Sequence, residues 1–253
     1  MSRVGEVMAR VEHRPWGMPT GPWIMEQVWR DLLFMHWRAP AELVSRLVPA
    51  GLEVDTFDGS AWISVTPFHM SVRFRGAPLM PGMARIPEMN CRTYVSAKGA
   101  SEREKKAGIC FFSLDCGSRA AVWGARTFYH LPYFFAKMRV EKKSGGGREW
   151  VRYESRRGEV RFRGEYEATR EVREAKKGTL NHWLTERYCL YSAWRGRVYR
   201  GEIHHVPWPL QEARVMIAEN SVVGQVSGEI GGEPEAVSYA RELDVMIWGL
   251  KRV

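Results

Sequence analysis

Charged or hydrogen-bonding residues alternate with apolar ones along several segments of this chain, and this alternation limits the folds open to it. The segments are residues 88–95, 150–156 and 159–166. A period of two places successive side chains on opposite faces of a β-strand, whereas an amphipathic helix repeats its apolar positions every three to four residues. The chain is therefore predicted to consist mainly of antiparallel β-strands joined by hairpins.

The turn signals and the domain organisation agree with this prediction. Asp58-Gly59 is a strong hairpin signal before a strand over residues 61–74. Residues 1–22 are rich in Pro and Gly and are predicted to form an irregular arm. No internal repeat or linker divides the remainder, so residues 23–253 are predicted to be one domain. The expected fold class is α+β, mainly antiparallel β, as a barrel or sandwich with a few packed helices.

The composition argues against several classes of protein. The net charge of +9 attracts nucleic acid, but Lys and Arg are interspersed with acids and no nucleic-acid-binding motif accompanies them, so a nucleic-acid partner is disfavoured. The four cysteines fit no metal-ligand spacing and are expected to be reduced core residues. The first residues lack the apolar run of a signal peptide, and no stretch is apolar enough to span a membrane. A cytoplasmic protein with no membrane partner is expected.

One strand face carries an unusual set of side chains. Glu88, Asn90, Arg92 and Tyr94 lie at alternate positions and are predicted to share a face, which we call the polar row. Arg92 can clamp a carboxylate or phosphate through two N–H groups, and Glu88 can act as an acid or base if burial raises its pKa. The alternative is a structural Glu–Arg network that staples the strands together. Both interpretations stay open at this point.

Two further residues are candidates for ligand binding. Arg126 lies on a helix predicted over residues 118–129, and it can reach an anionic ligand or pair with Asp115. Tyr133 can donate a hydrogen bond to a ligand oxygen or to a backbone carbonyl. The histidines lack the spacing of a metal site and are expected to be structural; those considered are His36, His69, His204 and His205. Neither a metal nor another cofactor is predicted.

Several collinear motifs resemble those of the YqjF-like family, a domain of unknown function (DUF2071) grouped with the acetoacetate decarboxylase-like superfamily. They include residues 32–37, 55–62, 88–95 and 205–210, and the resemblance extends from about residue 15 to residue 248. It implies a large, mostly antiparallel β-barrel around a solvent-accessible central cavity. Relatives in the superfamily commonly assemble, so a homo-oligomer is expected.

The resemblance also assigns roles, with one departure. Glu88 resembles the pocket glutamate of acetoacetate decarboxylases, but Tyr133 stands where those enzymes carry the lysine that forms an imine, and Phe134 replaces its lysine neighbour. A phenol cannot form an imine. Lys137 is predicted to share the strand face of Tyr133 and to offer an amine deeper in the barrel; its tip reaching solvent is the favoured alternative.

These observations predict a protein that binds a small anionic or carbonyl-containing molecule in a barrel cavity. A cofactor-independent reaction of the lyase or isomerase kind, with Glu88 transferring a proton, is one possibility, and imine-based decarboxylation is disfavoured. A non-catalytic sensor or carrier is the alternative, and a basic surface that binds nucleic acid is the third hypothesis. The sequence leaves the choice between enzyme and binding protein open.

Overall fold

The computed structural model describes residues 3–101 and 104–253. The first two residues of the predicted arm lie outside this part of the chain, as do residues 102–103. None of the helices in the described residues is long and apolar enough to cross a membrane.

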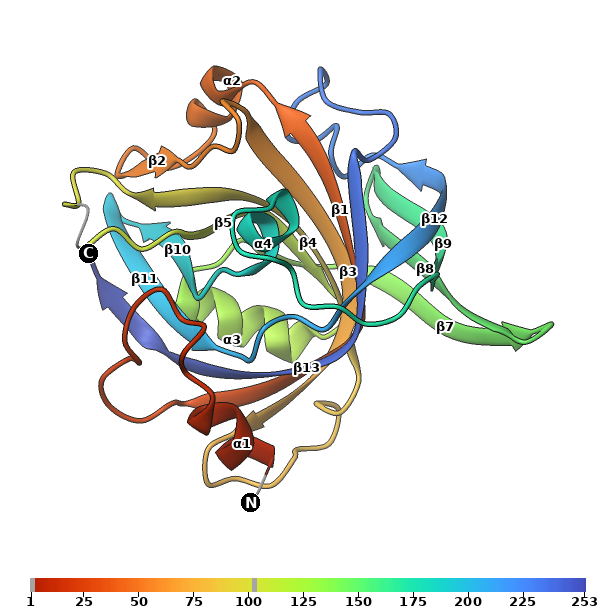
Figure 1. Cartoon of the computed structure of the whole chain (residues 1–253), viewed down its shortest axis with the longest axis horizontal. Coiled ribbons are helices and arrows are strands. Elements are labelled where there is room, and N and C mark those ends of the chain that lie inside the picture. The colour runs from red at the N-terminus through yellow and green to blue at the C-terminus, as the bar shows by residue number, and fades with distance from the viewer. Residues whose placement is uncertain (1–2, 102–103) are drawn as a thin grey trace.

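Seven strands form a closed barrel (Figure 1). The ring closes because β1 pairs with both β3 and β13. Neighbouring strands are antiparallel except for β5 and β10, which run parallel. In ring order the strands are β1 (Met25–Ala39), β3 (Ala61–Phe74), β4 (Ile86–Ala97), β5 (Gly108–Cys116), β10 (Cys189–Trp194), β11 (Arg197–His204) and β13 (Ala236–Arg252).

A second antiparallel layer covers part of the outer face of the barrel. It consists of β12 (Leu210–Asn220), β9 (Val160–Ala168), β8 (Arg148–Arg157) and β7 (Lys137–Gly145), and β12 joins it to the barrel by pairing with both β13 and β9. Tyr153 and Phe162 of this layer pack against Leu33 and Met35 of β1 in one apolar cluster. The paired strands predicted over residues 150–156 and 159–166 are thus confirmed as β8 and β9.

The helices are few and short. Helix α3 (Arg119–Tyr129) begins after Ser118, whose side chain accepts a hydrogen bond from the Ala121 N–H, and it ends at His130 in the left-handed conformation. The others are α1 (Arg3–Ala9), α2 (Ala41–Ser45) and α4 (Leu180–Thr185); the short strands β2 (Leu52–Val54) and β6 (Tyr133–Phe135) pair with β4 and β5. The prediction that residues 1–22 form an irregular arm is wrong in part, because α1 occupies some of these residues.

One predicted strand is divided in two. The sequence predicts a continuous strand over residues 131–140, but β6 ends at Phe135 and β7 begins at Lys137. β6 pairs with β5 in the barrel, whereas β7 pairs with β8 in the second layer. The chain changes sheets at Ala136, so the prediction that Tyr133 and Lys137 share a strand face is wrong.

Candidate functional site

The polar row on β4 faces the interior of the barrel. Glu88, Asn90, Arg92 and Tyr94 are all buried. Apolar residues of β1, β3, β5, β11 and β13 pack together in the interior. Two members of this cluster contact the polar row: Tyr133 contacts Glu88, and Phe34 contacts Arg92. The intervening Met89 and Cys91 belong instead to the apolar layer between the barrel and the second sheet. The period of two therefore directs the polar side chains inward.

Glu88 lies at one end of the row in an environment that favours its protonated form. The Tyr133 hydroxyl donates a hydrogen bond to Glu88 Oε2 at 2.7 Å. Burial raises the pKa of Glu88 to about 7, although hydrogen bonds from Tyr133 and Asn90 offset part of that rise. Near neutral pH Glu88 therefore exists in both protonation states, which suits a group that takes up and returns a proton.

Arg92 lies in the middle of the row without a carboxylate partner. Among the described residues no ion pair includes Arg92, and its Nε atom is buried with no hydrogen-bond acceptor. Its guanidinium carbon lies 5.4 Å from the centre of the Phe34 ring, and Tyr94 is its polar neighbour. A buried, unpaired cation is costly, and an anionic ligand would relieve that cost.

The alternative of a Glu88–Arg92 staple is not supported by this geometry. In the part of the chain that the structure describes, Glu88 bonds to Tyr133, and no ion pair connects it to Arg92. Burial is the main cause that lowers the pKa of Arg92, and the charge of Arg187 lowers it further. The two charged members of the row thus have separate environments.

The far end of the row carries a second guanidinium that sequence reasoning missed as a ligand-binding group. Arg187 follows α4; its Nη1 donates to Asp55 Oδ2 at 2.6 Å and its Nε to the Trp183 carbonyl at 2.7 Å. Its Nη2 is buried without an acceptor, and its guanidinium carbon lies 5.0 Å from the centre of the Tyr94 ring. The bond to Trp183 satisfies a carbonyl of α4, and no local sequence pattern indicates the contact with Tyr94.

A neutral imidazole completes this end of the row. His36 Nε2 and the Tyr94 hydroxyl lie 2.9 Å apart in a hydrogen bond. Burial and the charge of Arg92 lower the pKa of His36 to about 3, so the ring is uncharged at neutral pH. His36 therefore adds no positive charge beside the two guanidinium groups. Within the described residues, no group of three or more His, Cys, Asp or Glu side chains is arranged to hold a metal ion.

Three residues that the sequence analysis linked to the site have side chains outside the barrel interior. Arg126 is exposed on α3 and does not pair with Asp115. Asp115 instead accepts a hydrogen bond from Arg157 Nε at 2.6 Å, because its side chain faces the second layer, where β8 ends. Lys137 is exposed at the start of β7, as the favoured alternative predicted. The predicted pairing of Arg126 with Asp115 is thus wrong.

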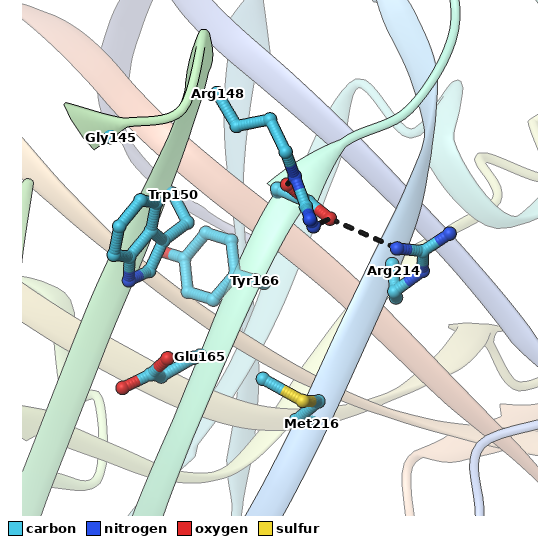
Figure 2. Close-up of a pocket in the computed structure, with 8 residues that line it drawn as sticks. Gly145, Arg148, Trp150, Glu165, Tyr166, Arg214 and Met216 are labelled. Carbon is cyan, nitrogen blue, oxygen red and sulfur yellow. Dashed lines mark hydrogen bonds and ion pairs between the residues drawn. The ribbon is translucent and has the colours of Figure 1, made fainter. Parts of the chain in front are cut away.

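A hollow of about 490 Å³ on the exposed face of the second layer is a weaker candidate (Figure 2). Trp150 and Met216 form apolar parts of its wall. Its rim carboxylate, Glu167, is already paired with Arg148 and Arg214. These charged side chains already form ion pairs with one another, whereas Arg92 of the polar row forms none among the described residues.

Comparison of the sequence with known proteins assigns the chain to a family. A model of the DUF2071 family, described as an uncharacterized conserved protein, matches residues 26–244. The uncharacterized protein YqjF of Bacillus subtilis (strain 168) is 41% identical over 244 residues, which cover 96% of this chain and 98% of YqjF.

Solved structures share the fold. The enduracididine biosynthesis enzyme MppR, complexed with pyruvate, matches with a TM-score of 0.62 at 14% identity, over 96% of this chain and 97% of MppR. An acetoacetate decarboxylase-like enzyme from Sphingomonas wittichii RW1 matches with a TM-score of 0.61 at 14% identity, over 95% of this chain and 98% of that enzyme. The expected acetoacetate decarboxylase-like fold is thereby confirmed.

Proposed function

Because this chain belongs to the DUF2071 family and has the acetoacetate decarboxylase-like fold, we propose that it binds a small carboxylate with an adjacent carbonyl group inside its barrel and transfers a proton on it through Glu88. The observation that carries the proposal is Arg92, a buried guanidinium with no carboxylate partner among the described residues. Arg187, with an unused buried N–H, lies beside the same row. Together they supply N–H donors that suit a carboxylate.

Glu88 supplies the chemistry in this proposal. With its pKa raised to about 7, the ionised form can take a proton from the carbon next to the ligand carbonyl, and the protonated form can return one. The C–H bond breaks, the proton passes to Glu88, and the electron pair moves onto the carbonyl oxygen as an enolate. Tyr133, already hydrogen-bonded to Glu88, orients the carboxyl group. No imine is needed, and among the described side chains of the row none is a lysine.

Pyruvate is a suitable probe of binding, since it is a small 2-oxo acid and the ligand of the structurally similar MppR complex. Arg92→Met should weaken pyruvate binding by about tenfold to a hundredfold, the loss expected for a hydrogen bond to a charged group. Isothermal titration calorimetry measures this directly. Arg163→Met, at an exposed position of β9, is the matched control and should bind like the wild type.

The stability of the Arg92→Met variant separates this proposal from a structural staple. Removing an unpaired buried cation should leave the melting temperature unchanged or raise it by a few degrees, roughly 2–4 °C for each kcal/mol. Unchanged pyruvate affinity together with a lower melting temperature would instead support the staple and contradict the proposal.

Proton exchange distinguishes a catalyst from a carrier. In deuterated buffer the wild type should replace the methyl protons of pyruvate, with a rate that rises as pH increases through about 7 because the carboxylate form of Glu88 is the base. Glu88→Gln should abolish this exchange while still binding pyruvate, and proton NMR measures both. Binding without exchange in the wild type would support the non-catalytic carrier.

A further inference from the structure

We infer that the ligand enters the barrel through a gap in its wall between β5 and β10, and that Phe111 is the side chain that closes this gap. The inference relies on the proposed function for the identity of the ligand, a small carboxylate. A groove of about 410 Å³ lies on the outside of the barrel at this position and would be the entrance.

The gap follows from the strand pairing. β5 and β10 are in register only at Ile109–Leu190 and Cys110–Tyr191. Farther along, β5 pairs with β6 from Leu114 onward. Between these two pairings, residues 111–113 of β5 have no registered strand partner on that side in the described part of the chain. The barrel wall is therefore interrupted over these residues.

An irregularity in β5 places the gap beside the polar row. On its other edge β5 pairs with β4, and the register shifts so that Cys91 lies opposite Ser113 but Arg92 lies opposite Phe111. Phe112 is thus the extra residue of a β-bulge, a feature that re-aims side chains and often lies next to functional sites. Arg92 and the break in the wall meet at the same level of the barrel.

Phe111 separates the groove from the interior. Phe111 lines the groove and is only partly buried. It also packs against two apolar clusters of the interior, of which one contains Tyr133 and the other contains Tyr94. Tyr133 also lines the groove, while its hydroxyl bonds to Glu88 inside the barrel. A rotation of the Phe111 side chain would therefore connect the groove with the polar row.

The rim of the groove suits an anion. Arg126 and His130 at the end of α3 line it, opposite Ser192 and Ala193 of β10. Arg126 is exposed, so its positive charge attracts a carboxylate from solution toward Arg92. This assigns a role to a cation that the sequence singled out and that the interior site does not use.

A thiol placed inside the barrel tests the passage without any ligand. Ser64 is fully buried, lies on β3 and bonds to Thr66, and Ser64→Cys is nearly isosteric. The reagent is sulfonatoethyl methanethiosulfonate, a small anion, and mass spectrometry assigns the modified cysteine. Adding Phe111→Ala should speed labelling at position 64 by about tenfold, equivalent to lowering an opening barrier by about 1.4 kcal/mol.

A second substitution tests the passage in the opposite direction. Ala193→Trp, at an exposed position that lines the groove, should slow labelling at position 64 by a similar factor because the indole fills the groove. Cys91 serves as an internal control, since it is fully buried on the opposite face of β4. Its labelling rate should be the same in all three proteins.

The outcomes separate this inference from the proposed function. No change at position 64 in either variant, or equal changes at position 64 and Cys91, would overturn the passage, because access would then require general opening of the barrel. Pyruvate binding is measured separately in the wild type. If pyruvate fails to bind while labelling responds as expected, the proposed function fails and the passage stands.

Discussion

Glu88 shows how a single residue acquires a property that its sequence neighbours do not determine. Its neighbours on β4 place it inside the barrel, but the hydroxyl that contacts it comes from Tyr133, 45 positions along the chain. Burial raises the pKa of Glu88 to about 7 from its ordinary value near 4.5. The folded protein therefore binds a proton that the unfolded chain releases between these two pH values.

This shift predicts a dependence of stability on pH. The contribution of Glu88 is fully present below about pH 4.5 and is lost as pH rises through about 7, a difference on the order of 3 kcal/mol. Glu88→Gln, which stays neutral, should lose this dependence and be more stable than the wild type at pH 8. Urea unfolding at several pH values measures the difference. Glu171→Gln, at an exposed position, should follow the wild-type curve; parallel curves for all three proteins would contradict the prediction.

At the scale of elements, α4 shows that a short helix depends on its contacts. Six residues are too few for a stable isolated helix. Leu184 packs with Trp62 and Tyr94, and the ion pair of Arg187 with Asp55 ties the end of α4 to the chain after β2. α4 thereby covers the Tyr94 end of the polar row and holds Arg187 beside it.

Breaking this ion pair should loosen α4. Asp55→Asn leaves Arg187 without its carboxylate and should cost on the order of 3 kcal/mol, as expected for removing one partner of a largely buried pair. This corresponds to a fall of roughly 6–12 °C in melting temperature, measured by calorimetry. Asp58→Asn is the control, because this exposed turn residue has a φ of 50° that Asn tolerates, and it should change stability by less than about 0.5 kcal/mol. Equal effects of the two substitutions would refute the role of the ion pair.

At the scale of the whole molecule, the net charge of +9 and the interior site are separate features. Much of the basic charge lies on exposed side chains, many of them in surface ion pairs such as Arg148–Glu167 and Arg152–Glu165. Arg92, by contrast, is buried and does not face bulk solvent. Surface attraction to polyanions should therefore be independent of the ligand site.

Heparin chromatography tests this separation. The wild type should elute at moderate salt, since exposed charges are screened over about 8–10 Å at physiological ionic strength. Arg92→Met should elute at nearly the same salt concentration while losing pyruvate binding. A large shift in elution caused by Arg92→Met would mean that Arg92 belongs to a nucleic-acid-binding surface. The expected homo-oligomer stays a prediction.

Local sequence patterns were enough to predict most of the strands, the family and the shared face of the polar row. Alternation with a period of two depends only on local backbone geometry, so the shared face of Glu88, Asn90, Arg92 and Tyr94 was predictable. The tight turn at Asp58-Gly59 was also predictable, but the expected hairpin is wrong, because β2 pairs with β4 and not with β3. The resemblance to the DUF2071 family, inferred from the motifs, is confirmed by the family model and by the relative that is 41% identical.

Contacts between groups far apart in the sequence depend on how the strands pair and the layers pack. No local pattern places Arg187 beside Tyr94, divides the strand at Ala136, or pairs Asp115 with Arg157 instead of Arg126. These contacts arise from closure of the barrel and from the second layer, which bring together segments separated by many residues. The physical reason is that periodicity sets the face on which a side chain lies, whereas pairing between distant strands sets what it faces there.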